Sequence, residues 1–164
     1  MDHPSVTVWG IHAGQYGNAE NIFFARGYIA IGWELGHLGE LPNDQEAFKQ
    51  RLAAKYPEAP SRSHALIAGV IRRFVYDIKI GDAVVCRPKK SAPNLVFLGR
   101  VAGPYLYNPL IDPEYADVRR VEWLRTVPVE QISVSARQEL AAWMTLFKID
   151  KHADEYLALL SGLL

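Results

Sequence analysis

The chain has 164 residues, of which 49% are hydrophobic and 22% are charged, a composition that supports a packed core and argues against disorder. Its length fits a single domain spanning residues 1–164. The formal net charge is zero, which argues against a uniformly basic protein that coats nucleic acid, although residues 61–125 carry 11 basic and 6 acidic side chains and can present a local basic face.

The first segment of the chain is expected to form two strands joined by a loop and a short helix. β-Branched and aromatic residues over 7–11 predict one strand, and the apolar run 28–33 predicts the other. Between them, Asn18 is suited to cap a helix over about 19–26, which Gly27 would end.

Two longer helices are expected next. The first begins at a cap formed by Asn43 or Asp44 and runs to about Lys55, and the second begins at a Ser63 cap and runs to Ile78. Apolar side chains recur at helical spacing through the second helix, which predicts that it packs centrally in the core.

The second half of the chain is expected to contain three strands and then two helices. The strands are predicted at 83–87, 95–102 and 117–125, and the helices at 134–147 and 151–160. This order favours an α+β fold with a small, curved, mixed and mostly antiparallel sheet or open β-barrel flanked by helices. No signal pattern and no apolar run of roughly 18 residues is present, so a cytoplasmic protein without membrane contact is expected.

Several short motifs, taken together in order, resemble the N-terminal region of Mrr-type restriction system proteins over about residues 8–150. The motifs are VWGIHAG (8–14), IAIGW (29–33), IGDAVV (80–85), LGRVAGPY (98–105), VRRVEW (118–123) and MTLF (144–147). The arrangement is also similar to the PUA-like superfamily, especially its EVE and YTH branches. The resemblance implies a PUA/EVE-like fold and a reader of modified DNA, such as DNA with methylated or hydroxymethylated bases.

The same resemblance nominates residues for a base-binding pocket. By position, Trp33 matches the aromatic wall of a cage that holds a modified base in these branches, although a tryptophan after an apolar run is also a common core residue. The polar contacts would come from the loop that carries His12, Gln15, Tyr16 and Asn18, whose donors and acceptors suit the edge of a base. The alternative is that this loop is an ordinary capped turn.

Other aromatic and acidic residues are nominated from their place in the chain. Trp9 precedes the polar loop and would line the same pocket, and Tyr105 or Tyr107 in the long loop would supply the second wall. Glu34 could accept a hydrogen bond from an exocyclic amino group, or simply be solvated. Trp123 and Trp143 are interpreted as core residues.

The phosphate backbone of the ligand would require unpaired cations. Six arginine and lysine residues are nominated for this role, with a solvated surface as the alternative for each. They are Arg62, Arg72, Arg73, Arg87, Lys89 and Lys90.

No catalytic pattern emerges from the sequence. There is no acid pair, activated nucleophile or metal-ligand spacing among the histidines and the single cysteine, so we expect neither an enzyme nor a metal or other cofactor. The restriction proteins that the chain resembles carry a nuclease domain after the reader. This sequence has no Asp…Glu-x-Lys nuclease signature, so a nuclease partner would be encoded separately.

Two alternative functions stay open. An RNA-binding PUA-like module would use the same stacking, since stacking on a base does not select the sugar. A structural partner of a restriction or stress system would use the amphipathic segment 156–160 to pack on itself or on another protein.

Overall fold

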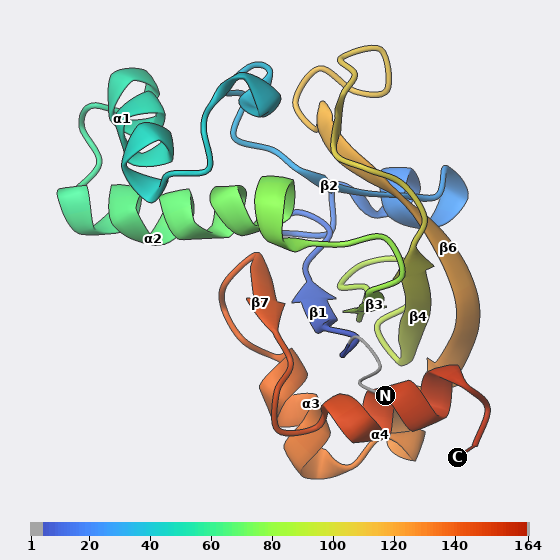
Figure 1. The fold of residues 1–164 in the computed structure, drawn as a ribbon. Helices are drawn as coiled ribbons and strands as arrows, with labels where there is room; N and C mark the ends of the chain where they lie inside the picture. Colours follow the sequence, from blue (N-terminus) through green and yellow to red (C-terminus); the bar gives the residue numbers. More distant parts are fainter. Residues whose placement is uncertain (1–4, 164) are drawn as a thin grey trace.

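The computed structural model describes residues 5–163, which form a curled sheet with helices on both sides (Figure 1). The strands are β1 (Val8–Ile11), β2 (Tyr28–Ile31), β3 (Ala83–Cys86), β4 (Leu95–Val101), β5 (Leu106–Tyr107), β6 (Asp117–Pro128) and β7 (Leu146–Lys148). The α-helices are α1 (Gln45–Lys55), α2 (Ser61–Arg72), α3 (Val134–Leu140) and α4 (Ala153–Leu160). Short helical turns are η1 (Asn21–Ala25), η2 (Leu38–Glu40), η3 (Arg73–Asp77) and η4 (Val129–Gln131). Within residues 5–163, no helix has the length and apolar character needed to cross a bilayer.

The sheet is mixed but mostly antiparallel. Its strand order is β2-β6-β4-β3-β1-β7, and β5 pairs with β6 beside this path. The β1–β3 pair is parallel, whereas every other strand pair is antiparallel. The predicted α+β class, with a small curved and mixed sheet flanked by helices, is therefore confirmed.

Strand alternation divides the interior into two hydrophobic cores. In β3, Val84 and Cys86 face the first core, whereas Ala83 and Val85 face the second, because successive side chains of a strand point to opposite faces. Residues of α1, α2 and η1 complete the first core, and residues of α3 and α4 complete the second. Figure 1 shows α1 and α2 on one side of the strands, and α3 and α4 on the other.

The structure confirms one predicted helix cap and corrects another. Asp44 caps α1 by accepting a hydrogen bond from the Glu46 amide at 3.2 Å. The Ser63 cap is wrong, because α2 already begins at Ser61 after Pro60. Pro60 occupies the cap position itself, in an extended conformation and without a side-chain cap hydrogen bond.

The largest correction concerns the helix predicted over 134–147. Helix α3 ends at Leu140, and β7 then runs antiparallel to β1, with Phe147 paired to Gly10. A Cβ at position 10 would lie only 2.3 Å from the Phe147 ring, so glycine permits this close approach. Pairing with a strand from the start of the chain outweighs the local helical preference.

Candidate functional site

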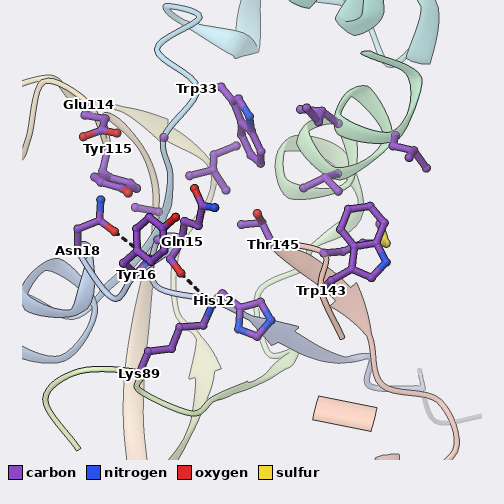
Figure 2. A pocket seen from close by; sticks show the side chains of 18 residues that line it. His12, Gln15, Tyr16, Asn18, Trp33, Lys89, Glu114, Tyr115, Trp143 and Thr145 are labelled. Atoms are coloured by element: carbon purple, nitrogen blue, oxygen red, sulfur yellow. Dashed lines mark hydrogen bonds between the residues drawn. The ribbon is translucent and has the colours of Figure 1, made fainter. Parts of the chain in front are cut away.

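A pocket of about 580 Å³ opens between the loop after β1, the segment after β2, helix α2 and the turn before β7. Its volume falls within the ~300–1,000 Å³ typical of small-molecule sites. Figure 2 shows aromatic, polar and apolar side chains around it, including Lys89 from the segment after β3 and Glu114 and Tyr115 from the segment before β6. The lining residues are His12, Gly14, Gln15, Tyr16, Asn18, Ala30, Ile31, Gly32, Trp33, Leu66, Ile67, Val70, Lys89, Glu114, Tyr115, Trp143, Met144 and Thr145.

Trp33, which the sequence nominated for an aromatic wall, lines this pocket just after β2. A Cβ at Gly32 would lie 2.6 Å from the Tyr115 ring, so Tyr115 packs against bare backbone just before the tryptophan. The Tyr56 hydroxyl donates a hydrogen bond to the Trp33 carbonyl at 2.7 Å. The backbone of Trp33 is thereby fixed, while its half-buried ring forms part of the pocket wall.

Trp143 is the second tryptophan of the pocket, and its interpretation as a core residue is wrong. It lies in the turn between α3 and β7 with 79% of its surface exposed. The His12 imidazole bonds through Nε2 to the carbonyl of Ala142, which ties this turn to the loop after β1. Trp143 lies outside the core because it belongs to neither α3, which ends before it, nor β7, which begins after it.

Each of the two pocket tryptophans has an indole N–H group that makes no hydrogen bond within the described part of the chain. Among residues 5–163, the indole N–H groups that donate hydrogen bonds within the chain are those of Trp9 and Trp123. The N–H groups of Trp33 and Trp143 therefore have no partner in this part of the chain, and both remain able to bond to a ligand or to water.

The nominated polar loop after β1 lines the same pocket. Gly14 and Gly17 both have φ of 81°, a left-handed conformation that glycine adopts without strain. The Asn18 side chain accepts a hydrogen bond from the Tyr16 amide at 3.3 Å, so its amide nitrogen stays free to donate. Gln15 is exposed beside them. The loop thus presents donors and acceptors along one side of the pocket.

His12 is a neutral member of this loop. Burial and the nearby Lys89 charge lower its pKa, and the Ala142 carbonyl only partly offsets them. Because Nε2 faces a carbonyl oxygen, it carries the proton of the neutral ring, and Nδ1 is left as an acceptor.

A buried carboxylate holds the segment that carries Lys89. Glu20 accepts hydrogen bonds from the amides of Lys89, Lys90 and Ser91 at 2.8, 3.0 and 2.7 Å. Burial raises the pKa of Glu20, but these hydrogen bonds outweigh it and lower the pKa overall. The Lys89 ammonium then donates to the Gln15 carbonyl at 3.0 Å, at the edge of the pocket. Sequence patterns did not predict this role for Glu20.

Trp9 does not reach the pocket, so its nomination is wrong. It is only 1% exposed, and its indole Nε1 donates to Asp82 Oδ2 at 2.9 Å. Position 9 lies on the face of β1 that fills the first core. Strand alternation turns Trp9 inward beneath the sheet.

Tyr105 and Tyr107 are also not pocket walls. The Tyr105 hydroxyl donates to Asp117 and accepts from the Leu38 amide. The Tyr107 ring stacks on His37 with centroids 5.6 Å apart. Both tyrosines belong to a separate cluster beside η2, because β5 pairs with the first part of β6.

Glu34 and most of the nominated cations do not line the pocket. Glu34 is exposed with φ of 53° and does not line the pocket. Arg72 forms a bidentate ion pair with Asp77. The Asp77 carboxylate therefore already compensates the charge with which Arg72 would bind a phosphate.

Among the other cations, Arg87 and Lys89 line a second pocket of about 470 Å³ that adjoins the first. Arg62, Arg73 and Lys90 line neither pocket. Burial and the nearby Arg72 lower the pKa of Arg73, which Asp77 only partly offsets. Of the six nominated cations, Arg87 and Lys89 therefore lie beside the pockets, whereas Arg62, Arg72, Arg73 and Lys90 do not line them.

Residues that the sequence did not nominate complete the pocket. Glu114, Tyr115 and Thr145 contribute polar atoms, and Leu66, Ile67 and Met144 contribute apolar surface. The apolar Leu66 lies next to the predicted core positions of this helix in the sequence, and the structure leaves it exposed at the pocket. Among residues 5–163, no group of three or more His, Cys, Asp or Glu side chains is arranged to hold a metal ion.

Comparison with known proteins gives one result. A family model described as "Domain of unknown function (DUF8426)" matches residues 9–150. No curated protein and no solved structure matches the chain. The matched span contains both Trp33 and Trp143, together with the loop that follows β1.

Proposed function

We propose that this chain, which belongs to the DUF8426 family because that family's model covers residues 9–150, is a non-catalytic module that binds nucleic acid through one modified base. The base would enter the pocket lined by Trp33 and Trp143. We further propose that the fold is PUA-like, close to the EVE and YTH branches, and that the module serves a restriction system.

The observation that carries this proposal is the pair of tryptophans with free indole N–H groups in one pocket. Stacking on an aromatic side chain contributes about 1–3 kcal/mol per base. Removing a base from a duplex costs a few kcal/mol. One aromatic wall barely offsets that cost, whereas two walls contribute enough to hold an extruded base.

Polar atoms around the pocket suit the edge of a base. His12 Nδ1 and the Glu114 carboxylate are acceptors, and the amide nitrogens of Asn18 and Gln15 are donors. Such a mixed set can match a donor–acceptor pattern that differs between bases. The same pocket contains few charges, which favours a neutral ligand group over a phosphate.

Apolar residues on one side of the pocket favour a methylated base. Leu66, Ile67 and Met144 line the pocket together. Burial of one methyl group stabilises binding by about 0.8 kcal/mol, which corresponds to roughly a fourfold preference over the unmodified base. Thr145 in the same wall could bond to a hydroxymethyl group. The resemblance to restriction proteins supports DNA over RNA.

The test measures binding of short labelled DNA duplexes that contain 5-methylcytosine, 5-hydroxymethylcytosine or cytosine. We expect tighter binding of a modified duplex, and a loss of roughly 5- to 150-fold for Trp33→Ala and for Trp143→Ala, from about 1–3 kcal/mol of stacking. Trp33→Phe should retain part of the affinity because it keeps a ring.

Tyr107→Ala is the matched control, since it removes a partly exposed ring that lines neither pocket. It should leave the affinity unchanged. Equal affinity for all duplexes, with no change in either tryptophan variant, would refute the proposal. Tighter binding of unmodified RNA of the same sequence would assign the pocket to RNA instead.

A further inference from the structure

The second pocket adjoins the first around the ring of Trp143. Its volume is about 470 Å³, and it shares His12, Lys89 and Trp143 with the first pocket. Arg87 and Arg137 line only the second pocket. A ligand with a base in the first pocket and a charged group beyond Trp143 would contact both.

Three cations of the second pocket are held in place by backbone carbonyl groups. Arg87 Nε donates to Pro93 at 2.8 Å, Lys89 Nζ to Gln15 at 3.0 Å, and Arg137 Nε to Ile132 at 3.0 Å. Each contact uses one donor and leaves the terminal guanidinium nitrogens, or the other ammonium protons, for a ligand.

The charges of these three residues are uncompensated. The ion pairs between side chains of residues 5–163 are Arg72–Asp77 and His152–Glu139, so none of the three cations has a carboxylate partner there. The buried Glu20 carboxylate accepts hydrogen bonds from the backbone amides of Lys89, Lys90 and Ser91 in the same segment. It positions the lysine and leaves the lysine charge free.

An arginine guanidinium presents a planar fork that matches two oxygens of a phosphate. Two such forks and a lysine, each anchored at one atom, form a site prepared for an anion. The apolar parts of the lining, Pro88, Pro93 and Leu140, offer surface for a sugar rather than for a free ion.

We propose that this pocket binds the phosphodiester next to the base held by Trp33 and Trp143, so that the ligand is a nucleic-acid strand bent around Trp143. This inference rests on the proposed function and adds Arg137 as a phosphate-binding residue. It also assigns the phosphate contact to the α3 side of the pocket, away from the arginines of α2.

The test uses one modified DNA strand in two forms, with either a natural phosphodiester or a neutral methylphosphonate next to the modified base. The wild-type protein should bind the neutral form roughly tenfold more weakly, since it loses hydrogen bonds to a charged group. The double variant Arg87→Gln/Arg137→Gln should bind the two forms with a much smaller difference, because only Lys89 still provides a charge at the site. Its plot of log affinity against log salt should be shallower by about 0.7 for each lost phosphate contact.

Arg62→Gln is the matched control, because it removes a cation that lines neither pocket. It should preserve the difference between the two strands. The inference is overturned if the wild-type protein binds both strands equally while Trp33→Ala still weakens binding; the base pocket would then stand without this phosphate site.

Two other outcomes are decisive. A modified nucleoside monophosphate that binds as tightly as the strand would overturn the assignment to a strand. If the wild-type protein shows no preference for the modified base but still binds the methylphosphonate strand more weakly, the proposed function is overturned and the phosphate site is supported. The methylphosphonate comparison uses the wild-type protein, so it holds even if the double variant is unstable.

Discussion

Two sets of aromatic residues in this molecule behave in opposite ways. Trp9 and Tyr105, the anchored aromatics, donate their polar hydrogens to the buried carboxylates of Asp82 and Asp117. Trp33 and Trp143, the pocket aromatics, have indole N–H groups without partners among residues 5–163. A buried carboxylate thus holds Trp9 inside the core and Tyr105 against its edge, because each ring finds an acceptor for its polar hydrogen there. Trp33 and Trp143, without such an acceptor among residues 5–163, line a surface pocket.

The largest expected effect comes from removing one ring of each set. Trp9→Ala should lower the free energy of unfolding by about 3–5 kcal/mol, because it leaves a large cavity in the core. Trp143→Ala should change it by no more than about 0.5 kcal/mol, as at other exposed sites. Urea denaturation of both variants measures the difference. Equal losses of stability would erase the distinction between the two sets.

The next effect is the pH dependence of stability that arises from Asp117, the residue to which the Tyr105 hydroxyl donates. Burial raises the pKa of Asp117 to about 6, although the Tyr105 hydrogen bond and His37 oppose it. Between pH 4 and pH 6 the folded protein therefore holds a proton that the unfolded chain releases. Its contribution to stability is present at low pH and is lost as the pH rises to about 6, by at most about 3 kcal/mol.

The measurement is the unfolding free energy of the wild-type protein minus that of Asp117→Asn at each pH, which cancels the other titrating groups. We expect this difference to fall from pH 4 to pH 6 and to be flat above. A difference that rises with pH would mean that Asp117 is ionised in the fold throughout this range.

Tyr105→Phe should produce a smaller loss of stability, about 1–3 kcal/mol, because the Leu38 amide and Asp117 each lose a hydrogen-bond partner. It should also raise the pKa of Asp117 further, so that the pH-dependent loss extends to higher pH. Ligand affinity should not change, since Tyr105 lies outside the pocket. A loss of affinity comparable to that of Trp33→Ala would restore Tyr105 as a pocket wall.

The smallest expected effect is the pH dependence of ligand binding. Burial lowers the pKa of His12, with Lys89 adding to the effect, so the ring stays neutral above about pH 6.5. Affinity for a modified duplex should therefore vary less than about twofold between pH 6.5 and pH 8. A steep gain on acidification through this range would show that a protonated His12 binds the ligand.

Local patterns in the sequence predicted much of the fold. Alternation and β-branched residues indicated β1, β2, β3, β4 and most of β6, and the cap at Asp44 was correct. The polar loop after β1 and Trp33 were placed in the candidate site, and both line the pocket. These features depend on residues close together in the chain, where propensity and period are informative.

The identity of the second aromatic wall was decided by tertiary structure. Pairing between β7 and β1 ends the helical segment and leaves Trp143 in a turn, while a hydrogen bond from Trp9 to Asp82 holds the other ring inside. Each depends on a partner far away in the sequence. The sequence by itself determined where strands, caps and a polar loop form, because their causes are local. Only the folded chain could decide which tryptophan meets a buried acceptor and which is left at the pocket.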